Sequence, residues 1–175
     1  MRLQLTLAIL KPDLAIRPYS VEHVRNIILK NGFLSIDSQQ VRLSRSKVQE
    51  FYKEHEKKFF YNRLVTYMSS GMSHIYILGH KEEAILNWRA LMGPTKVLKT
   101  RLEQPETIRG QIGLTDTRNS THGSDSEANA RQEIQFFFPE FDYDLFYSSQ
   151  LDSKFIDGQL NGSLRLDRVK FQHFL

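Results

Sequence analysis

The residues best suited to chemistry lie together at positions 119–125. Of the six histidines, only His122 is followed by a glycine, and Gly123 is expected to leave one flank of the imidazole free. The next residues can start a helix, and Ser124 has capping-box spacing to Glu127. Free N–H groups at a helix start bind phosphate and disfavour imidazolium. This window favours His122 as a neutral nucleophile toward phosphorus, the alternative being an ordinary loop histidine beside a helix cap.

The bulk composition is that of a globular protein. The chain has 175 residues, 40% hydrophobic and 25% charged, so one domain without covalent staples is expected. It has no cysteine, which excludes disulfides and thiolate metal sites, and no apolar run reaches the ~18 residues of a membrane-spanning helix. The net charge of +4 and the pI near 9.3 suit an anionic ligand, whether nucleotide, nucleic acid or membrane surface.

The N-terminus bears on the compartment. Met1-Arg2 is followed at once by alternating apolar and polar residues, which leaves no room for a cleavable leader or a signal-peptide apolar block. We therefore expect a protein of the cytoplasm or the mitochondrion, and not a secreted one.

Hydrophobic periodicity indicates the elements that must position His122. It predicts strands over residues 3–9, 33–43 and 74–78, and helices over residues 21–30, 44–56, 60–68, 85–92 and 124–138. Ser20 is expected to cap the first helix, while Ile85, Trp88 and Met92 are expected to form one face of the fourth. A short strand is expected just before the last helix.

The stretch from Thr95 to Asn119 has little periodicity of either kind. Such a long connection is unusual in a compact domain and is usually functional or disordered. The order of elements predicts an α+β domain, in which helices cover one side of a mostly antiparallel sheet. We expect this domain over residues 1–139, with a C-terminal extension over residues 140–175 that packs on it or trails from it.

Several short motifs together resemble the nucleoside diphosphate kinase family. In chain order they are Lys11-Pro12-Asp13, Tyr52 followed by Phe60 and Leu64, Arg89 with Gly93 and Thr95, Thr107-Ile108-Arg109-Gly110, and Arg118-Asn119-x-x-His122-Gly123-Ser124-Asp125. The motif around His122 is the most specific of them. The motif Leu91-Met92-Gly93-Pro94-Thr95 and the longer loop after it are similar to the divergent sixth type of animal nucleoside diphosphate kinase.

The resemblance implies a fold and a reaction. The fold is a ferredoxin-like βαββαβ sandwich with an antiparallel sheet and a long loop before the catalytic histidine. The reaction is a ping-pong transfer, in which a nucleoside triphosphate gives its γ-phosphoryl group to His122 and a nucleoside diphosphate then takes it. The match implies that Glu133 orients His122, and that Ser124 and Tyr52 belong to the same catalytic group.

By the same match, a second set of side chains binds the nucleotide: Lys11, Phe60, Leu64, Arg89, Thr95, Arg109 and Asn119. Arg89, Thr95 and Arg109 are expected at the phosphates, because guanidinium forks suit phosphate oxygens. Lys11 and Asn119 are expected at the sugar hydroxyls and the phosphate end. Phe60 is expected to stack on the base above Leu64, and stacking of ~1–3 kcal/mol tolerates any base. Alone, each residue also fits a structural role.

Magnesium is implied by the substrate and not by a ligand cluster in the sequence. No carboxylate set has metal-site spacing, so we expect Mg²⁺ to be bound through the nucleotide phosphates, and we predict no protein ligand for it. Asp125 could reach the ion through water. The remaining histidines receive no role: His23, His55, His74, His80 and His173.

The expected partners are nucleoside tri- and diphosphates. A homo-oligomer is compatible with the sequence, but a hexamer does not follow, because the loop and the residues after Pro139 differ from the segments that join subunits in the family. Asp116 replaces a small apolar residue on the base side and could bias base choice. The alternative function is a weakly active or inactive kinase-fold protein that binds nucleotide or depends on a protein partner. Nucleic-acid binding would rest on net charge alone and is not expected.

Overall fold

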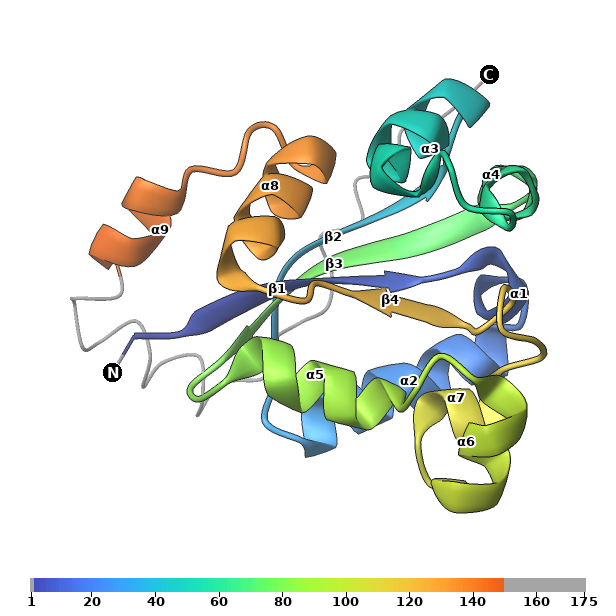
Figure 1. Ribbon diagram of the computed structural model, residues 1–175. Coiled ribbons are helices and arrows are strands. Elements are labelled where there is room, and N and C mark those ends of the chain that lie inside the picture. Colours follow the sequence, from blue (N-terminus) through green and yellow to red (C-terminus); the bar gives the residue numbers. More distant parts are fainter. Residues whose placement is uncertain (1, 150–175) are drawn as a thin grey trace.

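The computed structural model describes residues 2–149, so residues 150–175 of the C-terminal extension and His173 lie outside the described part of the chain. Its centre is a four-stranded antiparallel sheet with strand order β2-β3-β1-β4 (Figure 1). The strands are β1 (Gln4–Leu10), β2 (Leu34–Arg42), β3 (Met72–His80) and β4 (Thr121–Gly123). This is the ferredoxin-like α+β arrangement that the motifs imply, and the predicted strands are confirmed.

Two layers of helices enclose the sheet (Figure 1). The first layer contains α3 (Arg45–Phe51), the short 3₁₀ turn η1 (Lys53–His55), α4 (Tyr61–Met68), α8 (Glu127–Phe137) and α9 (Tyr143–Ser149). The second contains α1 (Pro12–Ala15), α2 (Pro18–Lys30), α5 (Ala84–Met92), α6 (Val97–Glu103) and α7 (Ile108–Ile112). The prediction that helices cover one side of the sheet is therefore wrong.

The physical reason is that β1 is apolar on both faces. Leu7 and Ile9 point into a core with α3, α4 and α8, whereas Ala8 and Leu10 point into a second core with α1, α2, α5 and α7. All four side chains are fully buried. A strand that is buried on both faces needs helices on both faces. The alternating sequence over residues 3–9 does not show this, because Thr6 looks like a solvent-facing residue but is buried.

Three predicted local details are wrong, and the first two concern the start of α2 and the buried face of α5. The helix expected to follow Ser20 begins earlier, at Pro18, because a proline with its fixed φ and missing N–H suits the first helical position. Ser20 is buried inside α2 instead of capping it. In α5 the buried residue of the first turn is Ala84, and Ile85 is partly exposed.

The third correction concerns residues 95–119, which form two short helices despite their weak periodicity. Asp116 accepts a hydrogen bond from the backbone N–H of Val97, the first residue of α6, at 3.0 Å. Thr107 caps α7 by accepting from the N–H of Gly110. These helices are held by polar contacts across the loop, which leave no apolar period in the sequence. Over residues 2–149, no helix is long and apolar enough to cross a membrane.

Candidate active site

His122 lies in the middle of β4, opposite Ile9 of the central strand. Its Nε2 is 2.9 Å from Oε1 of Glu133, which comes from α8. The hydroxyl of Ser124 donates to the other oxygen, Oε2, at 2.6 Å. An ionised carboxylate can only accept, so Nε2 is assigned as the protonated nitrogen. Nδ1 then carries the lone pair and is the nucleophilic nitrogen of the ring.

The spacing of Ser124 to Glu127 predicts that Ser124 caps the helix, but Ser124 does not cap α8. It is fully buried, and its hydroxyl oxygen accepts from the N–H of Leu7 at 3.1 Å while donating to Glu133. The hydroxyl is therefore already used between β1 and the carboxylate. Ser126 caps the helix, because its side chain accepts from the N–H of Asn129. His122 consequently lies on a strand, several residues before the helix begins.

Gly123 has a different role from the one predicted from its position beside His122. A Cβ atom at this position would lie 2.4 Å from Cδ1 and 2.7 Å from Nε1 of Trp88, and 2.8 Å from Cε of Met92. The missing side chain therefore makes room for Trp88 under the strand. These contacts do not support the prediction that Gly123 leaves one flank of the imidazole free.

Two aromatic rings stand edge-on to the imidazole. Phe51 has its centroid 5.3 Å from that of His122, and Tyr52 has its centroid 6.3 Å away. The Tyr52 hydroxyl is buried and has no hydrogen-bond partner within residues 2–149. Burial, and secondarily the charge of Glu133, raise the pKa of Tyr52, so its hydroxyl stays protonated and can donate. An unpaired buried donor beside a nucleophile is suited to an incoming oxygen.

A cleft of about 560 Å³ opens in front of His122. Of the predicted site residues, all except Ser124 line it: Lys11, Tyr52, Phe60, Leu64, Arg89, Thr95, Arg109, Asn119, His122 and Glu133. These side chains come from segments as far apart as the end of β1, α4, α5 and α8. The fold thus brings together in one cavity what the motifs scatter along the chain. A cleft of this volume is within the range of small-molecule sites.

Lys11 is buried at the inner end of the cleft. Its Nζ donates to Oδ1 of Asn119 at 2.7 Å, and its backbone N–H donates to the carbonyl of Ser120 at 2.8 Å. Burial, and then the charge of Arg109, lower the pKa of Lys11 from 10.5 to about 7, while the carboxylate of Asp13 opposes this. An incoming anion would favour the ammonium form of this lysine.

Arg109 is also buried and already makes three hydrogen bonds. Its guanidinium donates to the carbonyls of Gly93, Asn119 and Thr121 at 2.6, 3.3 and 3.0 Å. Burial, and then the charge of Arg89, lower the pKa of Arg109 to about 10, so it remains a cation at neutral pH. Arg109 therefore clamps the ends of the long loop to β4 while it lines the cleft. Arg89 and Thr95 are exposed at the rim.

His55 lines the cleft, although no role was predicted for it from the sequence. Its ring stacks on Tyr52 with centroids 6.1 Å apart, and it meets Phe60 edge-on at 5.7 Å. The three-residue spacing to Tyr52 places both side chains on one side of a helical turn, which is the signal that could have identified it. Phe60 is the cap residue before α4, where it is partly buried, packs on the core and lines the cleft.

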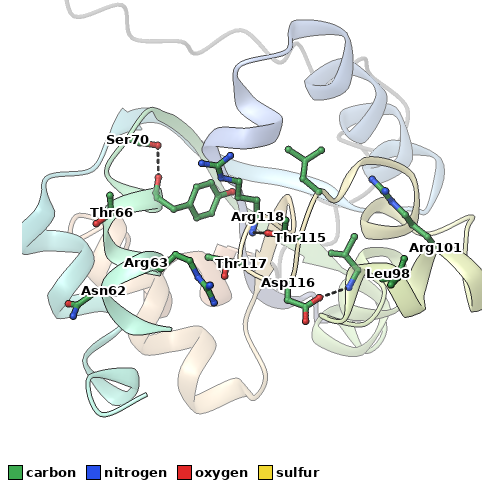
Figure 2. Close-up of a pocket in the computed structure, with 13 residues that line it drawn as sticks. Asn62, Arg63, Thr66, Ser70, Leu98, Arg101, Thr115, Asp116, Thr117 and Arg118 are labelled. Carbon is green, nitrogen blue, oxygen red and sulfur yellow. Dashed lines mark hydrogen bonds between the residues drawn. The ribbon is translucent and has the colours of Figure 1, made fainter. Parts of the chain in front are cut away.

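A second cavity, of about 910 Å³, adjoins the cleft and shares Arg63, Asp116 and Thr117 with it. Figure 2 shows its two walls, α4 on one side and α6 with the turn at residues 115–118 on the other. Asp116 does not point its charge freely at the cleft, because Lys96 and the N–H of Val97 both donate to its carboxylate. The hydrogen bond from Lys96, foremost among the causes, lowers the pKa of Asp116.

Residues 2–149 contain no group of three or more histidine, cysteine, aspartate or glutamate side chains that could hold a metal ion. Asp125 is one of the acidic residues that line the cleft, and its pKa is lowered, first by a hydrogen bond from Asn129. Since the described residues offer no such group, a divalent ion in this cleft would be bound mainly by ligands that it brings with it.

Comparison with known proteins gives consistent matches. The family model described as "Nucleoside diphosphate kinase" matches residues 4–143. Over 148 residues the chain is 52% identical to nucleoside diphosphate kinase 6 of Xenopus tropicalis, covering 85% of this chain and 82% of that protein. It is 49% identical to nucleoside diphosphate kinase 6 of Homo sapiens over the same length, covering 85% and 79%.

Solved structures agree with these relatives. A nucleoside diphosphate kinase of Aquifex aeolicus superposes with a TM-score of 0.73 and 33% identity, covering 78% of this chain and 95% of that chain. One of Halobacterium salinarum, in complex with CDP, superposes with a TM-score of 0.71 and 29% identity, covering 77% and 87%. The resemblance that the motifs carry is thereby confirmed in sequence and in fold.

Proposed function

The chain belongs to the nucleoside diphosphate kinase family, and on that premise we propose that it transfers the γ-phosphoryl group of a nucleoside triphosphate to a nucleoside diphosphate through phospho-His122. The single observation that carries the proposal is the contact between Nε2 of His122 and Glu133 inside the cleft. Because that contact occupies one ring nitrogen, it directs the lone pair of the other nitrogen toward substrate.

In the first half-reaction, Nδ1 of His122 forms a bond to the γ-phosphorus. The bond from that phosphorus to the bridging oxygen breaks, and the departing diphosphate keeps the electron pair. The ring gains positive charge during this step, and the adjacent carboxylate of Glu133 stabilises it while the proton stays on Nε2. In the second half-reaction, the terminal oxygen of a nucleoside diphosphate forms a bond to the same phosphorus, the bond from phosphorus to Nδ1 breaks, and its electron pair returns to the nitrogen, which restores neutral His122.

The cations of the cleft would hold the polyphosphate. Arg89 and Thr95 at the rim, and Arg109 beneath them, are proposed to contact phosphate oxygens, with Lys11 and Asn119 at the sugar hydroxyls and inner phosphate end. The Tyr52 hydroxyl supplies a further donor near the phosphorylated ring. Mg²⁺ bound by the nucleotide would neutralise part of the phosphate charge, and the described residues contain no carboxylate cluster that would hold the ion by itself.

At the other end of the nucleotide, Phe60 and Leu64 are proposed to contact the base. Stacking on Phe60 depends on the π-face that all bases share, which supports broad base specificity. Asp116 is held by Lys96, so it braces α6 and is not a free acid that repels the base.

Labelling with γ-³²P-ATP tests the proposal. The wild-type protein should acquire an acid-labile, base-stable phosphoryl group and pass it to added nucleoside diphosphate. His122→Ala should acquire none, whereas His23→Ala, which removes an exposed histidine bonded to Gln111, should label normally. Labelling that persists in His122→Ala would refute the assignment of the nucleophile.

A second candidate function is a partner-dependent module, and one feature favours it. Leu98 and Leu102 on α6 are 74% and 78% exposed, and Leu98 lines the large cavity shown in Figure 2. Exposed leucines one helical turn apart are typical of a surface that meets another protein. Mass in solution, measured alongside labelling, separates the two candidates. A monomer that labels at full rate supports the kinase alone, and a monomer that binds nucleotide without labelling supports the module.

A further inference from the structure

Trp88 is the only tryptophan of the chain, and it lies directly beneath the strand that carries His122. It is fully buried on α5, and its indole Nε1–H donates to the backbone carbonyl of His122 at 3.2 Å. Its ring also meets Phe33 edge-on, with centroids 6.3 Å apart, so a second aromatic side chain packs against the indole. A buried indole needs an acceptor, and here the acceptor is the candidate nucleophile's own backbone.

The fit between the indole and the strand is close. Any side chain on Gly123 would overlap Cδ1 and Nε1 of Trp88, so β4 rests on the indole with no atom between them. The absence of a side chain at Gly123 therefore matches the shape of Trp88, and the indole sets the distance, or height, between β4 and α5.

This height matters because β4 is anchored weakly by its own backbone. It is three residues long, lies at the edge of the sheet and, among the strands of residues 2–149, pairs with β1 alone. The residue after Trp88 is Arg89, which lines the cleft. One side chain thus couples the strand that carries His122 to the helix that carries a proposed phosphate ligand.

We propose that Trp88 is a positioning residue for phosphoryl transfer, acting through its N–H bond to the His122 carbonyl. The proposal rests on the function proposed above. The bond holds the backbone of His122 so that Nδ1 stays in line with the phosphorus, while the packing of the indole fixes where Arg89 stands relative to the ring. In-line geometry is sensitive to small displacements, since an error of about 1 Å can cost roughly 100-fold in rate.

The first test compares Trp88→Phe with Val24→Ala. Trp88→Phe keeps an aromatic ring but removes the donor, and Val24→Ala loosens the same core at a fully buried position outside the cleft. We expect Trp88→Phe to lower kcat roughly 10- to 100-fold with KM for ATP changed less than about twofold. Val24→Ala should change neither, measured well below both melting temperatures. Equal kcat losses in the two variants, or wild-type kcat in Trp88→Phe, would overturn the proposal.

The second test uses the wild-type protein and needs no substitution. A ¹⁵N-labelled sample should give one indole N–H cross-peak with slow hydrogen exchange, and the peak should shift when His122 is phosphorylated. Exchange at the rate of a free indole, or a peak unmoved by phosphorylation, would contradict the positioning contact. If the protein takes up no phosphate at all, the proposed function fails, while the exchange rate still reports on the bond from Trp88 to His122.

Discussion

Replacing Lys11 with methionine should make the protein more stable while it removes a cation from the cleft. Methionine fills a similar volume without a charge. In the wild type, burial and then Arg109 lower the pKa of Lys11 from 10.5 to about 7. A lysine whose pKa falls on folding is one whose ammonium the folded state disfavours, so Lys11 decreases the free energy of unfolding.

The sign and size of the effect follow from the two pKa values. Below pH 7 the lysine is charged in both states, and the fall from 10.5 to about 7 corresponds to roughly 5 kcal/mol lost from the free energy of unfolding. Between pH 7 and 10.5 the unfolded chain binds the proton that the folded chain releases, so stability rises with pH. The loss shrinks to about 2 kcal/mol at pH 9. The hydrogen bond to Asn119, which the substitution removes, offsets about 1.5–3 kcal/mol.

We therefore expect Lys11→Met to raise the free energy of unfolding by about 2–3 kcal/mol at pH 6 and to leave it nearly unchanged at pH 9. Urea unfolding followed by circular dichroism at both pH values measures this. Lys30→Met is the matched control, because Lys30 is exposed in the last turn of α2. A Lys11→Met protein that is less stable than wild type at pH 6, or whose advantage is the same at both pH values, would refute the reasoning.

Three further predictions concern the rest of the site. Glu133→Gln keeps the shape of the side chain but removes the charge beside His122, so the initial rate of labelling by γ-³²P-ATP should fall roughly 10- to 100-fold; an unchanged rate would exclude the orienting role. Arg109→Lys cannot reach all three carbonyls, so urea unfolding should show a loss of about 2–3 kcal/mol, and a loss below about 0.5 kcal/mol would contradict the clamp. Phe60→Ala should weaken binding of Mg-ADP by about 1–3 kcal/mol in calorimetry, equally for Mg-GDP; a loss confined to one base would contradict stacking.

The fold was predictable from the sequence where apolar residues repeat with a clear period. The strand over residues 3–9 and the helices before Asn31 and Gly93 end within one residue of their predicted ends. Burial of Thr6 on the second face of β1 was not predictable, since a threonine in an alternating strand also suits a solvated face. Helices cover both faces of the sheet because β1 is buried on both of its faces.

The candidate site was predictable as a set of residues but not as a set of contacts. The motifs name Arg109, yet no local pattern shows that its guanidinium is bonded to carbonyls of Gly93 and Thr121. The contact between Trp88 and His122 joins residues 34 positions apart, and it depends on the height of a strand that packing alone fixes. Long-range polar contacts of this kind carry no periodicity, which is why residues 95–119 resembled an open loop.

The short edge strand β4 has an evolutionary consequence. β1 and β3 pair along all seven residues of β1, whereas β4 adds three residues at the margin and its histidine is not part of either core. On the proposed mechanism, a substitution at His122 would end phosphoryl transfer and one at Glu133 would slow it, while the packed centre of the molecule stays in place. In a duplicated gene, such a chain could drift from catalyst to binding protein without ever ceasing to fold, so architecture and activity can be inherited separately in this protein.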